Sequence, residues 1–197
     1  TIESEFKDRY PGNWVLGKNE KGRIDYISGG TIPIDARVGG NVEKLVDTLS
    51  KILDVPTEQL EEQPLNPTTK TDLSRVTEFK QNVDGLEVYQ GQVSVHSRES
   101  DGAVFLINNG SKKVGDYNKV PQLSANEAKQ ILVIKYGTAI QSLNLKRGPI
   151  IFVGASGETE LVWIFEVKIA SPKFHGIEAV VGAESGLVLS EIPTTVR

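Results

Sequence analysis

The fold is first indicated at Asn41-Val-Glu-Lys-Leu-Val-Asp-Thr-Leu-Ser-Lys-Ile-Leu53, where apolar side chains recur every three or four positions. That spacing places them on one face of a helix of about three and a half turns. The apolar set consists of Val42, Leu45, Val46, Leu49, Ile52 and Leu53. A helix with one apolar face needs an apolar surface to cover, and a sheet is the usual partner.

Strand-like runs flank this helix on both sides. Residues 13–15 and 23–28 predict a hairpin before it, joined by a polar turn that ends at Gly22. Residues 73–81, 86–96 and 103–109 predict an antiparallel meander after it, with Asp101-Gly102 in the last turn. Between the helix and the meander, residues 56–69 carry three prolines and predict a surface loop.

The same order of elements repeats in the second half of the chain. Ser124-Ala-Asn-Glu127 forms a capping-box pattern, so we expect a helix from there to about Tyr136. Strands are predicted afterwards at residues 150–153, 161–169, 177–181 and 187–191, with Ser185-Gly186 in the final turn. The run around Trp163 and Phe165 is typical of a central strand, with a contact surface as the alternative.

These patterns predict an α+β protein of two modules, each with one helix packed on an antiparallel sheet. The boundary is expected in the polar, Gly- and Pro-containing segment 111–123. We therefore predict modules at residues 1–118 and 119–197.

Composition excludes several classes of function. Lys and Arg number 22 against 26 Asp and Glu, without a basic run, so we expect no nucleic-acid partner. The longest apolar stretch, 161–165, is far shorter than the roughly 20 residues of a membrane span. The chain has no Cys, which excludes disulfides, thiolate zinc sites and cysteine nucleophiles. It has no Met and starts at Thr1, so we expect that a segment upstream was removed or omitted, which is compatible with export.

The search for catalytic chemistry finds no consistent set of residues. His96 and His175 do not form the His-Glu-x-x-His arrangement of zinc proteases, and a strand-end His96 is more typical of a structural residue than of a ligand. The stretch Gly154-Ala-Ser-Gly157 lacks the frame of a nucleophile elbow and predicts a turn. We therefore expect no catalytic residues, no metal, no cofactor and no enzyme activity.

A family resemblance lies in the meander, where Asp84-Gly-Leu-Glu-Val-Tyr-Gln-Gly-Gln-Val-Ser-Val-His96 precedes the turn at Asp101-Gly102. It resembles the fungalysin/thermolysin propeptide motif. The matching residues are Gly85, Val88, Tyr89, Gly91, Val95, His96, Asp101 and Gly102. Downstream, the segment Pro121-Gln-Leu-Ser-Ala-Asn-Glu-Ala128 and the strands at 163–167 and 184–189 are similar to a PepSY module, which implies a cystatin-like arrangement there.

The resemblance implies a secreted propeptide that helps a thermolysin-type zinc metalloprotease to fold and inhibits it, so the expected partner is the catalytic domain of that protease. The alternative is a stand-alone secreted binding or inhibitor module that acts in trans. Pro193 favours an extended tail that approaches the substrate cleft, although a disordered end is equally compatible with the sequence. The expected inhibitory tail consists of Ile192, Pro193, Thr194, Thr195, Val196 and Arg197.

Overall fold

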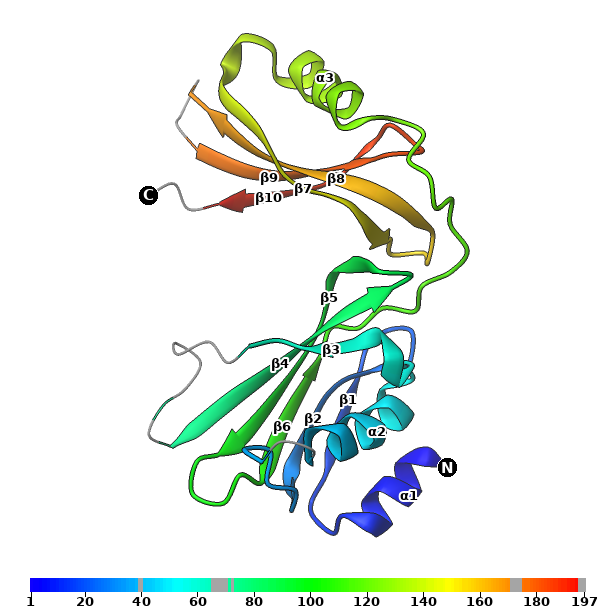
Figure 1. Ribbon diagram of the computed structural model, residues 1–197, viewed down its shortest axis with the longest axis vertical. Helices are drawn as coiled ribbons and strands as arrows, with labels where there is room; N and C mark the ends of the chain where they lie inside the picture. The colour runs from blue at the N-terminus through cyan, green and yellow to red at the C-terminus, as the bar shows by residue number, and fades with distance from the viewer. Residues whose placement is uncertain (39–40, 65–70, 72, 171–174, 195–197) are drawn as a thin grey trace. The chain divides into compact units, whose positions relative to one another are not determined.

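The computed structural model describes residues 1–38, 41–64, 71, 73–170 and 175–194 (Figure 1). The chain divides into two compact units, Thr1–Lys113 and Val114–Arg197. Our expected boundary between residues 118 and 119 lies further along the segment without helix or strand that follows the first unit. Within the described ranges, no helix is long and apolar enough to cross a membrane.

The first unit is a six-stranded antiparallel sheet with helices on one face (Figure 1). Its strands lie in the order β1-β2-β6-β5-β4-β3. In chain order its elements are α1 (Ile2–Arg9), β1 (Val15–Lys18), β2 (Ile24–Ile32), α2 (Asn41–Leu53), the 3-10 turn η1 (Thr57–Gln59), β3 (Leu60–Glu62), β4 (Ser74–Val83), β5 (Leu86–Arg98) and β6 (Val104–Asn109).

The core of this unit lies between α2 and the sheet. Leu45 and Leu49 of α2 are completely buried, as the helical spacing of the sequence requires, and they share a cluster with Val93 and Val95 of β5. Helix α1 adds Phe6, whose ring packs edge-on against the Trp14 ring with centroids 5.1 Å apart. Burying one such large side chain contributes roughly 1.5–3 kcal/mol, so α1 is held by packing rather than by its own helix propensity.

The second unit is a four-stranded antiparallel meander, β7-β8-β9-β10, with one helix on a face of the sheet (Figure 1). Leu132 of the helix and Phe165 and Val167 of β8 are completely buried in a common cluster. In chain order the elements are α3 (Ala125–Tyr136), the 3-10 turn η3 (Gly137–Ala139), β7 (Ile140–Val153), β8 (Thr159–Ile169), β9 (His175–Gly182) and β10 (Val188–Thr194).

The predicted capping box opens α3. The Glu127 amide donates to Ser124 Oγ at 3.3 Å, and the Ser124 amide donates to Glu127 Oε2 at 2.8 Å. Two of the four amides that a helix start leaves without partners are thereby satisfied. A second contact holds the chain just before α3, because Trp163 Nε1 donates to the Leu123 carbonyl at 2.9 Å.

The structure confirms the α+β class and the packing of helices on antiparallel sheets. The prediction of one helix per module is wrong for the first unit, where α1 precedes the sheet. The strand expected at 13–15 starts only at Val15, and the loop expected over 56–69 contains η1 and β3. Strand β7 begins at Ile140 rather than at residue 150. Each error falls on a segment whose structure is held by pairing or packing with distant residues.

Candidate functional site

The family-motif residues of the first unit build a bulge in β5. Lys80 of β4 pairs with Gln92 and Asn82 pairs with Glu87, so the four residues 88–91 stand opposite Gln81 alone. The backbone of Gln90 accommodates the extra residues of β5 by adopting a positive φ of 54°. A bulge of this kind re-aims side chains and ends regular pairing, which makes it a recurrent feature near functional surfaces.

Gln81 fills the bulge and is completely buried. Its Nε2 donates to Gln59 Oε1 at 2.9 Å and to the Lys112 carbonyl at 2.8 Å, and its Oε1 accepts from the Lys112 amide at 2.7 Å. A Cβ on Gly91 would lie 3.0 Å from Gln81 Oε1 and 2.8 Å from Val88 Cβ. The glycine at this motif position is therefore needed for the close approach of the chain to Gln81.

The Asp101-Gly102 end of the motif docks the β5–β6 hairpin onto the segment after β2. Gly102 has a φ of +73°, and a Cβ there would lie 1.8 Å from Asp35 Oδ1. Asp35 is itself bound by Arg37, whose Nε and Nη2 donate to its two carboxylate oxygens at 2.8 and 2.7 Å. These hydrogen bonds hold the pKa of Asp35 at about 2, and Arg98 likewise lowers the pKa of Asp101.

His96 lies beside Asn108 of the neighbouring strand, with Nε2 3.2 Å from Asn108 Nδ2. Partial burial lowers the pKa of the imidazole, so the neutral ring is favoured near pH 7. The neutral ring can accept the Asn108 hydrogen bond, which is the structural role expected for this histidine. The three remaining motif residues are Tyr89, which is buried in the bulge of β5, Val95, which lies in the core, and Gly85, which lies in the β4–β5 turn.

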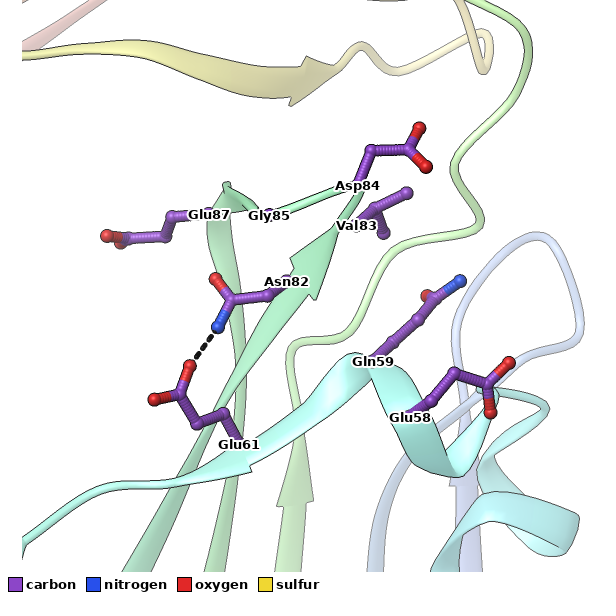
Figure 2. A pocket seen from close by; sticks show the side chains of 8 residues that line it. All are labelled: Glu58, Gln59, Glu61, Asn82, Val83, Asp84, Gly85 and Glu87. Carbon is purple, nitrogen blue, oxygen red and sulfur yellow. Dashed lines mark hydrogen bonds between the residues drawn. The ribbon is translucent and has the colours of Figure 1, made fainter.

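An acidic hollow of about 640 Å³ lies where η1 and β3 meet the β4–β5 turn (Figure 2). Asn82 donates a hydrogen bond to Glu61, and Glu87 forms an ion pair with Lys80 at 3.8 Å. Figure 2 shows that the carboxylates around the hollow point in different directions. Within the described ranges, His, Asp and Glu side chains do not form a group of three or more that could hold a metal ion.

The C-terminal strand β10 forms an edge of the second sheet. In the described part of the chain it pairs with β9 alone, in the antiparallel register Glu191↔Ala179 to Thr194↔Gly176. The structure therefore places Ile192, Pro193 and Thr194 of the expected inhibitory tail in a strand. Thr195, Val196 and Arg197 lie outside the described residues. Pro193 suits an edge strand because it has no amide proton to give to a second neighbour.

Glu191 anchors this edge strand to the end of α3. Its carboxylate accepts a hydrogen bond from Tyr136 Oη and pairs with Lys135 Nζ at 2.6 Å. Two donors from one helix end restrict where β10 can lie relative to α3. Because the Lys135–Glu191 ion pair is partly exposed, it adds little to the free energy of unfolding and serves mainly to position β10.

The sequence patterns did not identify Gln81, Glu191 or the hollow. Gln81 sits at a regular alternating position of β4, and its burial depends on the bulge in β5. In the sequence Glu191 is a carboxylate at the end of a predicted strand, and its contacts with Lys135 and Tyr136 depend on the position of α3. In the sequence, the only indications of the Gln81 site were Gly91 within a predicted strand and the apolar residues around Gln81. Neither of them indicates which residues Gln81 contacts.

Comparisons with known proteins find similar chains among solved structures alone. No protein-family model matches the chain, and no curated protein matches it. Among solved structures, the Bacillus megaterium YpeB C-terminal domain is similar, with a TM-score of 0.43 and 14% sequence identity over 99% of this chain and 95% of that one. At this level the likeness says nothing about a shared family or function.

Proposed function

We propose that the chain is a secreted propeptide that assists the folding of a thermolysin-type zinc metalloprotease and then inhibits it. The proposal is supported by the motif resemblance, whose Gly91 and Gly102 occupy positions that only glycine fits, and by the division into two α+β units. In this proposal residues 1–118 are the fungalysin/thermolysin propeptide module and residues 119–197 the PepSY module. The chain itself would carry no catalytic residues.

The observation that carries the inhibitory part is the edge strand β10. An extended strand with one unpaired edge can add to the sheet of a partner through main-chain hydrogen bonds. In the proposed complex the part of β10 before Pro193 lies against an edge strand of the protease, because Pro193 cannot donate a main-chain hydrogen bond, and the chain after Pro193 runs toward the substrate cleft. Occupation of the cleft would then block substrate until the tail is cut.

Glu191 acts in this scheme as a positioning residue. The donors Lys135 and Tyr136 fix the point from which the tail leaves the second unit. A tail fixed at its base loses less conformational entropy on binding than one that moves freely. Loss of the anchor should therefore weaken inhibition without changing the fold.

The experiment adds the purified chain to a denatured thermolysin-type protease during refolding and then measures residual activity against added chain. We expect a higher refolding yield with the chain, and inhibition at least about tenfold weaker with a chain that ends at Glu191. Glu191→Gln should weaken inhibition by about two- to fivefold, because one charged hydrogen-bond acceptor becomes neutral. Glu166→Gln, on an exposed β8 position, is the matched control and should inhibit normally.

Two outcomes would separate the alternatives. Inhibition without any gain in refolding yield would favour a stand-alone module that acts in trans. Equal inhibition by the full chain and the chain ending at Glu191 would contradict the role of the tail.

A further inference from the structure

A second hollow, of about 460 Å³, lies in the first unit between the end of α1, one face of α2 and the segment after β2. Its lining includes the apolar residues Pro33, which is exposed, and Ile34, which is half-buried, together with the buried Tyr10. Tyr10 Oη lies 3.5 Å from Thr48 Oγ1, and Thr48 Oγ1 donates to the Lys44 carbonyl at 3.0 Å. A concave surface of this size, with apolar residues beside charged and polar ones, can take a short segment of another chain.

Three cationic side chains surround this hollow. Lys44 and Lys51 stand seven positions apart on α2, which places them on the same face of that helix, and Arg9 ends α1. All three are exposed, and none forms an ion pair with another described residue. Arg9 is held over the Tyr10 ring, with the guanidinium carbon 5.4 Å from the ring centre.

The charge of the hollow is opposite to that of the chain. Among the described residues of its lining, Asp47 is the single carboxylate, so three cations against one anion give a local charge of about +2. The whole chain carries a formal charge of −4. Cationic side chains next to apolar ones favour a ligand that presents carboxylates on both sides of an apolar side chain.

We propose that this hollow binds an acidic, partly apolar peptide segment of a partner protein. Arg9, Lys44 and Lys51 pair with its carboxylates, and an apolar side chain of the segment packs on Pro33 and Ile34. A lone phosphate would occupy a small part of 460 Å³ and leave Pro33 and Ile34 uncovered. The site lies on the first unit and does not depend on β10, so it goes beyond the proposed inhibition.

The test uses the full ¹⁵N-labelled chain and a capped octapeptide of alternating glutamate and leucine. Titration at low salt should shift the amide signals of Arg9, Thr48 and Lys51, and the affinity should fall at least about threefold between 50 and 200 mM salt. The peptide with glutamine in place of glutamate should bind at least about tenfold more weakly. Inorganic phosphate, titrated alone, should shift these signals only at much higher concentration.

Charge-reversal variants make the assignment specific. Lys44→Glu with Lys51→Glu should reduce the affinity at least about tenfold, whereas the matched pair Lys21→Glu with Lys113→Glu should leave it unchanged. Glutamate in the last turn of α2 opposes the helix dipole, so Lys44→Ala with Lys51→Ala is the milder variant and should lose about three- to tenfold. Equal binding by either α2 variant and the original chain would overturn the proposal, as would phosphate binding as tightly as the peptide.

Discussion

Replacing Gln81 with leucine should destabilise the first unit strongly. The change removes three hydrogen bonds, to Gln59 Oε1 and to the carbonyl and amide of Lys112. A buried hydrogen bond contributes about 0.5–1.5 kcal/mol net, and a polar group left without a partner costs about 1–3 kcal/mol. Because Lys112 is only half-buried and water can reach part of it, we expect a loss of about 2–4 kcal/mol.

Urea unfolding measures this loss in a Trp163→Phe background, where Trp14 reports on the first unit alone. Gln92→Leu is the matched control, because Gln92 is an exposed residue of β5, and it should change the free energy of unfolding by less than about 0.5 kcal/mol. A loss below about 1 kcal/mol for Gln81→Leu would refute the reasoning that Gln81 holds the bulge together.

Three further substitutions test the packing. Gly102→Ala should cost at least about 3 kcal/mol in urea unfolding because its Cβ meets Asp35, whereas Gly85→Ala, in open space at similar φ, should cost about 1–2 kcal/mol. Because the pKa of Asp35 is lowered to about 2, its ionised form stabilises the folded chain above about pH 4, and this contribution is lost as pH falls toward 2. Asp35→Asn should therefore make the free energy of unfolding depend less on pH between about 4 and about 2. An unchanged dependence would contradict this. Leu132→Ala should cost about 2–5 kcal/mol in thermal unfolding, and a small cost would mean α3 is not packed on its sheet.

The elements predicted most accurately are those whose own residues show a regular apolar spacing or a capping pattern. Helix α2 matches its predicted bounds because its apolar face is regular, and the Ser124–Glu127 box gave the start of α3. Helix α1 was missed because Phe6 is its single buried residue, so no apolar period is visible. The first part of β7 was missed because Asn144, Lys146 and Arg147 are polar and only pairing with β8 makes it a strand.

The candidate sites were less accessible to sequence reasoning because they combine distant segments. Gln59, Gln81 and Lys112 meet only when η1, β4 and the end of the first unit are in place. The basic hollow joins α1 to α2, and α1 was not expected. Single-sequence patterns describe local periodicity, so contacts between segments some 20 to 40 residues apart leave no trace in them.

The most direct test of the central proposal is a titration of the full chain against a panel of thermolysin-type metalloproteases, with an unrelated serine protease as control, at fixed salt. The proposal predicts selective inhibition that saturates as the protease is fully bound. Absence of inhibition across the panel, or equal inhibition of the serine protease, would contradict it.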